Sequence, residues 1–259
     1  MSLKTDESGF RRLELEYEVP GTPEQVWQAI ATGPGITSWF VPTKIEERVG
    51  GAVTFHLGEG MDSNGVVTAW EPPGRFAYEE PDWSPGAPPL ATEHLVETRS
   101  GGICVVRIVH SLFTSSDEWD DQIESFEGGW TPFIGVLRLV LTHFAGQPCA
   151  SFRVMNPVPL AEAEAWEALR GALGTAPFTG TEERGQALGK NENQTLLRLS
   201  EPAPGIALIG AYSWAGSTQV AMSVYLFGDQ AAEVVAREEP RWKEWMASLF
   251  TPAGVASPS

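Results

Sequence analysis

The residue best placed for acid–base chemistry is His110, which belongs to an alternating segment typical of a β-strand. Side chains two apart on a strand share a face, so His110 is expected on an apolar face, opposite to Arg107. The other members of that face are Cys104, Val106 and Ile108. A neutral imidazole there could bind a ligand carbonyl or act as acid and base near neutral pH. It could also be a structural histidine bonded to a neighbouring strand, and this interpretation is favoured.

The other histidines and the cysteines are weaker candidates. His94 alternates with threonine and valine on its strand and points either inward or to solvent, whereas His56 and His143 fall outside the expected apolar faces. Cys104 would need a nearby base to act as a nucleophile, and a buried structural role is favoured. No histidine pair has ligand spacing, and no phosphate-binding or nucleophile-elbow motif occurs, so neither a metal nor a cofactor is predicted.

Aromatic residues form a second group that could line a binding site. Small-molecule pockets are mostly apolar and carry a few polar groups that fix orientation. The candidate ligand-binding residues are Trp39, Phe40, Phe55, Trp70, Tyr78, Trp83, His94, His110, Trp130, Phe133 and Leu137. The same rings could instead fill a solid core. The sequence leaves an open cavity and a filled one as equal alternatives.

The composition limits the classes of function. The chain has 259 residues, with 17 Lys and Arg against 34 Asp and Glu, and the net charge of −17 disfavours nucleic acid as a partner. Two cysteines without a CxxC pair predict no disulfide framework. No stretch approaches about 18 unbroken apolar residues and the start of the chain is polar, so we expect a cytoplasmic protein without membrane insertion.

The first half of the chain predicts the elements that would position these residues. Alternating apolar and acidic side chains over 13–19 predict a strand, and Thr22 followed by Pro23 predicts the start of a helix. Short β-type segments separated by glycine and proline turns predict antiparallel hairpins over 45–110. A Pro-rich connection over 81–89 interrupts them and is expected to be a surface flap.

A long amphipathic helix is expected after the hairpins, ending near residue 146. Ser115 and Glu118 have the spacing of a capping box, and apolar residues then recur at intervals of four and three. Pro132 lies inside this pattern and should kink the helix near Trp130, because proline removes one backbone hydrogen bond and crowds the preceding turn. The element order predicts an α+β fold, with an antiparallel sheet that wraps the long helix.

The second half repeats features of the first. Pro20 and Trp27 recur as Pro159 and Trp166, both 139 residues later, within similar surroundings. Strands are expected over 152–155, 195–199, 206–214 and 219–227, followed by a helix over 229–250. The polar segment 180–193 is ambiguous. We therefore predict two domains, a complete one over 10–146 and a degenerate, shorter repeat over 150–251.

The first of these domains resembles the START-like, helix-grip (SRPBCC) superfamily, in the branch of the activator-of-heat-shock-protein-ATPase homologues. The residues that carry the resemblance are Val19-Pro20-x-x-Pro23-Glu24-x-Val26-Trp27-x-Ala29-Ile30, Trp39-Phe40, Val49-Gly50-Gly51, Gly65-x-Val67, and Gly129-Trp130 followed by Leu137. The resemblance implies a curved antiparallel sheet gripping a long C-terminal helix, with a mostly apolar cavity between them. It also implies functions that range from binding lipids or polyketides, through polyketide cyclisation, to binding a chaperone protein.

Three functions follow as hypotheses. The favoured one is a non-enzymatic binding protein for a hydrophobic small molecule, such as a lipid or a polyketide, held between the sheet and the long helix. The second is a cyclase or hydrolase that uses His110 in the same cavity. The third is a co-chaperone-like interaction module with a protein partner. A homodimer is left open.

Overall fold

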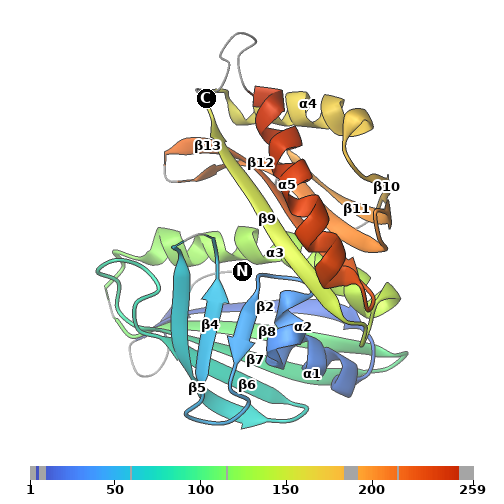
Figure 1. Cartoon of the computed structure of the whole chain (residues 1–259). Helices are drawn as coiled ribbons and strands as arrows, with labels where there is room; N and C mark the ends of the chain where they lie inside the picture. The colour runs from blue at the N-terminus through green and yellow to red at the C-terminus, as the bar shows by residue number, and fades with distance from the viewer. Residues whose placement is uncertain are drawn as a thin grey trace. The chain divides into compact units, whose positions relative to one another are not determined.

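A computed structural model describes residues 4–5, 10–58, 60–114, 116–183, 192–214 and 216–250 of the chain (Figure 1). The chain divides into two compact units, residues 1–147 and 148–259, which we call unit 1 and unit 2. Both units combine an antiparallel sheet with helices, which confirms the predicted α+β class. Residue 251, the predicted end of the second domain, lies outside the described residues.

Unit 1 is an eight-stranded antiparallel sheet gripping a long helix. Its strands are β1 (Lys4–Thr5), β2 (Arg11–Pro20), β3 (Thr43–Ile45), β4 (Ala52–His56), β5 (Asp62–Glu71), β6 (Arg75–Glu80), β7 (Leu90–Arg99) and β8 (Ile103–Leu112). Its helices are α1 (Pro23–Ala31), α2 (Gly33–Thr37) and α3 (Asp120–His143). The strand order is β1-β2-β8-β7-β6-β5-β4-β3, so the last strand pairs with the opening strand. Helix α3 packs against β2 and α1.

The opening strand and helix form where the sequence pattern places them. In β2, Leu15 is buried and Glu16 is exposed, as a strand with one wet face requires. Helix α1 begins at Pro23 because Thr22 caps it. The Thr22 hydroxyl accepts a hydrogen bond from the Gln25 amide at 3.3 Å, and the Gln25 side chain accepts one from the Thr22 amide at 2.9 Å.

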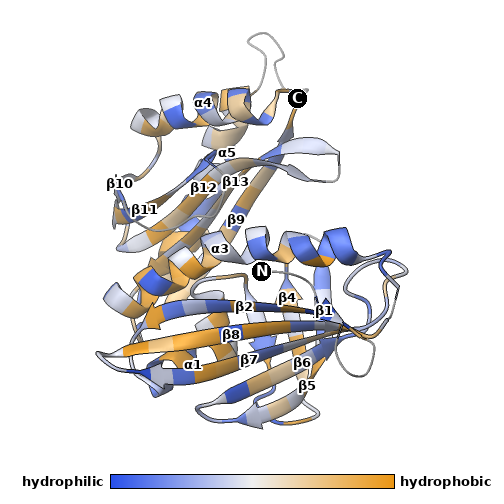
Figure 2. Cartoon of the chain, turned by 180° about the vertical axis from the view of Figure 1, so that it is seen from behind, coloured by the Kyte–Doolittle hydropathy of each residue, from blue (hydrophilic) through white to orange (hydrophobic). Residues whose placement is uncertain are grey.

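Strand β8 has a mostly apolar inner face that carries one histidine. Its inner residues are at most 2% exposed, and they are Cys104, Val106, Ile108, His110 and Leu112. Figure 2 shows hydrophobic residues along this strand. On the opposite face Arg107 pairs with Glu16 at 2.9 Å and with Glu97 at 3.2 Å. Strand parity therefore places His110 toward the helix and Arg107 away from it, as the sequence predicts.

Helix α3 is continuous over Asp120–His143 and contains Pro132. It begins four residues later than the capping-box spacing predicts, because the residues before it form turns in which the Asp120 amide donates to the Asp117 carbonyl. Its N-cap, Trp119, makes no side-chain capping bond. Ser115, on which the predicted capping box rests, lies outside the described residues. The kink near Trp130 stays a prediction.

Unit 2 is a five-stranded antiparallel sheet with helices. As in unit 1, an opening strand is followed by a helix, by further strands and by a last long helix. Its elements are β9 (Cys149–Val158), α4 (Glu162–Ala172), the 3-10 turn η1 (Leu173–Thr175), β10 (Thr179–Glu182), β11 (Gln194–Glu201), β12 (Gly205–Trp214), β13 (Ser217–Phe227) and α5 (Ala231–Phe250). The strand order is β10-β11-β12-β13-β9. The opening strand β9 therefore pairs with the last strand β13, as β2 pairs with β8, and the shortened second copy of the fold is confirmed.

Strand β10 is the element of unit 2 that the sequence pattern does not reveal. All four of its residues are exposed, so it has no alternation of apolar and polar side chains to read. Helix α5 contains Pro240 and packs against β9 and β13, whereas α4 packs against β12 and β13. The core between α5 and the sheet holds Trp242 and Met246, both fully buried.

Candidate functional site

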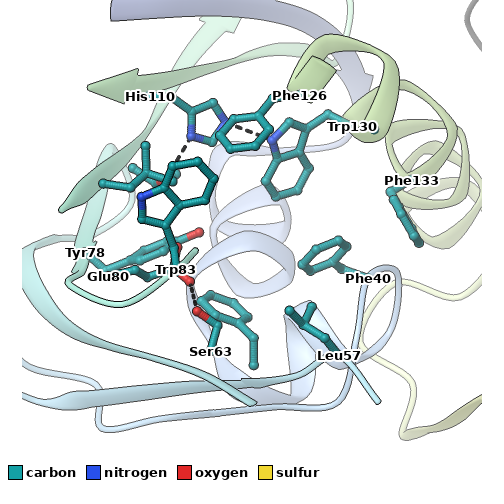
Figure 3. Close-up of a pocket in the computed structure, with 14 residues that line it drawn as sticks. Phe40, Leu57, Ser63, Tyr78, Glu80, Trp83, His110, Phe126, Trp130 and Phe133 are labelled. Carbon is teal, nitrogen blue, oxygen red and sulfur yellow. Dashed lines mark hydrogen bonds between the residues drawn. The ribbon is translucent and has the colours of Figure 1, made fainter. Parts of the chain in front are cut away.

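Unit 1 contains a cavity of about 270 Å³ between the sheet and helix α3 (Figure 3). Residues from every strand between β4 and β8, from the segment after α2, from the flap between β6 and β7, and from α3 contribute to its wall. They are Phe40, Phe55, Leu57, Ser63, Tyr78, Glu80, Trp83, Leu90, Thr92, His110, Phe126, Gly129, Trp130 and Phe133. The wall is therefore predominantly aromatic and aliphatic.

Aromatic rings in contact with one another hold the shape of this wall. Phe40 stacks on Trp130 with ring centroids 5.0 Å apart and meets Phe133 edge to face at 4.9 Å. On the sheet side, Phe55 and Tyr78 lie 5.2 Å apart. Such offset and edge-to-face pairs are the favoured aromatic geometries, so each ring restrains its neighbours. The cavity is consequently bounded by side chains that are positioned before any ligand arrives.

The Pro-rich segment 81–89 contributes Trp83 to the wall of the cavity. It contains no helix or strand. Trp83 donates its indole N–H to the carbonyl of Pro88 at 2.9 Å, which closes the loop on itself. The Trp83 ring then meets Phe126 of α3 edge to face at 5.6 Å and Trp119 at 6.2 Å. The flap is thus attached to the first turns of α3 through aromatic contacts.

His110 links the helix to the sheet through both of its ring nitrogens (Figure 3). Trp130 Nε1 lies 2.8 Å from His110 Nε2, and because an indole nitrogen only donates, Nε2 must be the acceptor. The proton of the neutral ring is then on Nδ1, which lies 3.0 Å from the Thr92 hydroxyl. Thr92 and His110 face each other across β7 and β8. His110 therefore fixes the orientation of Trp130 at the cavity wall.

Burial keeps the two inner histidines neutral. Desolvation, with a smaller contribution from His94, lowers the pKa of His110 to about 3. Desolvation alone lowers the pKa of His94 to about 4. His94 stacks against Phe76 at 5.9 Å and Tyr78 at 6.2 Å, and its Nδ1 is buried without a hydrogen-bond partner in the described part of the chain. Neither ring is suited to exchange protons near neutral pH.

Glu80 places a carboxyl group in this otherwise apolar wall. It is 9% exposed, and its Oε1 accepts a hydrogen bond from the Ser63 hydroxyl. Desolvation raises the pKa of Glu80 above its ordinary value, while the Ser63 hydrogen bond acts in the opposite direction. Burial also raises the pKa of the neighbouring Tyr78 well above its ordinary value, with the Glu80 charge as a second cause. The polar groups of the cavity thus gather around β6.

Seven of the eleven predicted binding residues line the cavity, and four do not. Those that line it are Phe40, Phe55, Tyr78, Trp83, His110, Trp130 and Phe133. Trp39 is 1% exposed and donates its indole N–H to the Ala29 carbonyl at 2.9 Å, so it belongs to the core around α1. Trp70 packs between Trp27 and Phe76. Leu137 and His94 are buried core residues that do not reach the cavity.

Seven lining residues are not among the sequence candidates. They are Leu57, Ser63, Glu80, Leu90, Thr92, Phe126 and Gly129. Strand parity could have found two of them, because Glu80 shares a face with Tyr78 and Thr92 shares a face with His94. Helical spacing could have found Phe126, which lies one turn before Trp130. No pattern in the sequence marks Ser63 or Leu57, whose positions depend on the β4–β5 turn.

The remaining candidates for chemistry lie apart from the cavity. Cys104 is buried, its thiol contacts the Gly21 carbonyl at 3.4 Å, and desolvation raises its pKa, which disfavours the thiolate. His56 pairs with Asp62 at 2.9 Å on the surface. Within the described residues, no group of three or more His, Cys, Asp or Glu side chains could hold a metal ion. The helices described here include none long and apolar enough to cross a membrane.

A family comparison matches the part of unit 1 that builds the cavity. Residues 20–142 match the family described as Activator of Hsp90 ATPase homolog 1-like protein. These residues run from the end of β2 to the end of α3 and include every residue of the cavity wall. No curated protein matches the chain.

Solved structures with a similar arrangement share little sequence with the chain. The di-domain ARO/CYC BexL from the BE-7585A biosynthetic pathway is 12% identical, with a TM-score of 0.45, and the match covers 95% of this chain and 100% of that one. DynU16, from the dynemicin biosynthetic locus, is 15% identical over 92% and 96% of the two chains, with a TM-score of 0.44. CalU16 from Micromonospora echinospora is 18% identical, with a TM-score of 0.44, over 55% and 83%. These scores are low, so the fold assignment rests on the strand order of the chain itself.

Proposed function

Because residues 20–142 belong to the activator of Hsp90 ATPase homolog 1-like family and form an aromatic cavity, we propose that the protein binds a hydrophobic small molecule between the sheet and α3. The observation that carries the proposal is the cavity itself. Its wall is mostly apolar and its rings restrain one another, which are the properties of a preformed ligand site. A site that is formed in advance avoids much of the ordering cost of binding.

The volume of the cavity limits the size of the ligand. An engineered apolar cavity of roughly 150 Å³ is enough to bind benzene. A cavity of about 270 Å³ lies near the lower end of the range for small-molecule sites and has room for a compact molecule with two or three rings. The proposed ligand is therefore a small cyclic compound, and a lipid with a long extended chain is a poorer fit.

The geometry of His110 favours binding over catalysis in this cavity. A general base needs a free nitrogen within reach of its substrate and a pKa near the working pH. Both nitrogens of His110 are engaged, by Trp130 and by Thr92, and its pKa is lowered to about 3. The role that the contacts support is to hold Trp130 in the wall. No contact described in unit 1 favours a protein partner over a small molecule.

Two neighbouring glycines of α3 provide a test of the proposal. Gly129 lines the cavity and Gly128 does not, and at both positions an added Cβ would meet no atom within 4 Å. Gly129→Phe should place a ring in the cavity and compete with the ligand, whereas Gly128→Phe should leave the cavity open. Both changes remove one glycine from the same helix, so their effects on helix propensity are matched.

The measurement is the fluorescence of N-phenyl-1-naphthylamine, an uncharged dye that brightens in apolar sites. We expect saturable binding to the wild-type protein and to Gly128→Phe, and at least about tenfold weaker binding to Gly129→Phe, a difference of about 1.4 kcal/mol. Equal binding to the two variants would show that the dye binds elsewhere. Failure of the wild-type protein to bind the dye saturably would contradict the proposed function for compact ring compounds.

A further inference from the structure

Glu80 is chemically unlike the rest of the cavity wall. Among the described lining residues it is the single one that can carry a full charge near neutral pH, since His110 is held neutral and no lysine or arginine lines the cavity. The charge of this carboxyl group raises the pKa of Tyr78, and Figure 3 shows its hydrogen bond with Ser63. Small-molecule sites commonly use a few polar groups on an apolar wall to orient the ligand. Glu80 has the position of such a group.

The described residues use only part of the hydrogen-bonding capacity of the Glu80 carboxyl group. Its one hydrogen bond within the described part of the chain comes from the Ser63 hydroxyl, to Oε1. No cation of the described residues pairs with it, and desolvation is the larger influence on its ionisation. A buried carboxylate without a counter-charge is unfavourable, and a positive group that arrives with a ligand would offset this cost. The empty space beside Glu80 is therefore electrostatically suited to a cation.

The aromatic rings of the cavity wall also favour a positively charged ligand. Aromatic faces carry partial negative charge and attract cations within about 6 Å of the ring centre. Trp83, Trp130 and Phe40 each contribute a ring to the wall. The whole chain, with a net charge of −17, attracts cations and repels anions at longer range. An anionic ligand would meet unfavourable charge from the carboxylate, the rings and the average field together.

We propose that the cavity takes a hydrophobic amine, whose protonated nitrogen pairs with the Glu80 carboxylate while its ring system lies against the aromatic wall. This inference rests on the proposed function, because it names the chemical class of the molecule bound in the same cavity. Ser63 acts as a positioning residue, since its hydroxyl holds one carboxylate oxygen and leaves the other for the ligand. Tyr78 lies on the same strand face and borders the pairing site.

A series of three naphthalene derivatives tests the class of ligand. 1-Naphthylmethylamine, 1-naphthylmethanol and 1-naphthoate share one ring system and carry a positive, a neutral and a negative group at neutral pH. Each is titrated against the dye-loaded protein, and its affinity is obtained from displacement of N-phenyl-1-naphthylamine. We expect the amine to bind about tenfold more tightly than the alcohol, a difference of about 1.4 kcal/mol, and the carboxylate to bind most weakly.

Two substitutions on β6 locate the origin of the preference. Glu80→Gln keeps the shape of the side chain and removes its charge, so the amine should lose about tenfold in affinity while the alcohol changes by less than about threefold. Glu79→Gln, on the opposite face of the same strand, changes the net charge equally and should leave the series unchanged. Ser63→Ala should weaken amine binding by a smaller factor. Melting temperatures establish that each variant is folded.

The outcomes separate this inference from the proposed function. Amine preference that disappears in Glu80→Gln and persists in Glu79→Gln supports a hydrophobic amine as the ligand. Binding of all three compounds without preference, or preference for the carboxylate, contradicts the inference and leaves the hydrophobic cavity as the binding site. Equal loss of amine affinity in both variants assigns the preference to net charge and also contradicts it. If the dye binds saturably and the amine does not displace it, the inference is contradicted and the proposed function stands. If the dye itself does not bind saturably to the wild-type protein, the proposed function is contradicted.

Discussion

Unit 1 and unit 2 both pair their opening strand with their last strand, and they differ in where the tryptophan of the long helix lies. In unit 1 the helix ring is Trp130, which lines the cavity and donates its indole N–H to His110. In unit 2 it is Trp242, which is fully buried and packs against Phe178 and Phe152, with centroids 4.5 Å and 5.4 Å away. The indole nitrogen of Trp242 has no hydrogen-bond partner in the described residues. Trp130 therefore borders the cavity of unit 1, whereas Trp242 is part of the core of unit 2.

The pairing register of the strands shows which residue occupies the position of His110 in unit 2. Counted along the pairing of the opening and last strands, His110 opposite Leu13 in unit 1 corresponds to Val224 opposite Phe152 in unit 2. Unit 1 therefore has a polar acceptor at this position of the inner face, and unit 2 has the apolar side chain of Val224 there. The hydrogen bond from the Trp130 indole N–H to this buried acceptor holds Trp130 at one position. The same frame thus holds a tryptophan that lines a cavity in unit 1 and a fully buried tryptophan in unit 2.

The largest expected effect is on stability, and it separates the two tryptophans. Trp242→Ala should cost about 3–5 kcal/mol of unfolding free energy, because it removes a fully buried indole from a filled core. Trp130 is only partly buried, so Trp130→Ala should cost less stability and should instead weaken dye binding. Urea unfolding and dye titration measure the two quantities.

A second substitution at position 242 keeps the comparison testable if Trp242→Ala does not fold. Trp242→Phe keeps an aromatic ring and removes the unpartnered indole N–H, so it should be less destabilising than Trp242→Ala and should leave dye binding intact. Similar stability losses at positions 130 and 242, or loss of dye binding in Trp242→Phe, would contradict the division into a binding unit and a packed unit.

Acid pH should affect unit 1 more than unit 2, because all four histidines of the chain precede residue 148. The pKa of His94 falls from 6.5 in the unfolded state to about 4 when folded, so the unfolded state binds more protons below pH 6.5. Stability is complete above pH 6.5 and is lost as the pH falls toward 4, by about 3 kcal/mol for this residue. His110, with a pKa of about 3, acts with the same sign. Glu80, with a raised pKa, partly opposes both.

His94→Leu tests this assignment directly. The substitution removes a buried nitrogen that has no partner, so stability at pH 7.5 should be unchanged or slightly higher and the loss between pH 6.5 and 4.5 should shrink. Urea unfolding followed by tryptophan fluorescence at a series of pH values measures the effect. His143→Leu, at an exposed position, is the matched control and should retain the wild-type pH profile. An unchanged profile in His94→Leu would contradict the prediction.

The smallest effect concerns the first helix of each unit. Helix α1 is capped by Thr22, whereas the equivalent residue of α4 is Ala161, which has no side-chain acceptor. Only the Ala161 amide takes part, donating to Glu164 at 3.3 Å. Ala161→Thr should therefore stabilise the protein by about 1 kcal/mol, and Thr22→Ala should destabilise it by about the same amount. Chemical unfolding measures both, and a destabilising Ala161→Thr would show that the two helix starts are not equivalent.

Periodicity predicted the elements and their faces better than it predicted the cavity. The alternation in β2 and β8 was enough to place Leu15 and His110 inward, because a strand has only two faces. The same rule could not distinguish His94 from His110, which share the inner side of neighbouring strands although only His110 borders the cavity. Strand parity gives the face of the sheet on which a residue lies. Whether that residue borders the cavity depends also on where along the strand it lies and on how far the helix covers that face.

The aromatic candidates illustrate a second limit. Trp39 and Phe40 are adjacent in the sequence, yet Phe40 lines the cavity and Trp39 is held in the core by its bond to the Ala29 carbonyl. Outside regular elements no period tells adjacent side chains apart, so the sequence could not separate them. Glu80 was missed for a different reason. Apolar character was the criterion for lining residues, and a carboxyl group becomes notable only when the absence of a counter-charge is visible.

The pairing of the opening strand with the last strand has a consequence for folding during synthesis. Strand β2 leaves the ribosome well before β8, and at about 5–20 residues per second the delay is on the order of ten seconds. Throughout that time the edge of β2 that pairs with β8 has no partner strand, and the sheet cannot close. Contacts so distant in sequence slow folding and prolong exposure to aggregation. Strand β9 waits less for β13, so unit 2 should complete its sheet after a shorter interval.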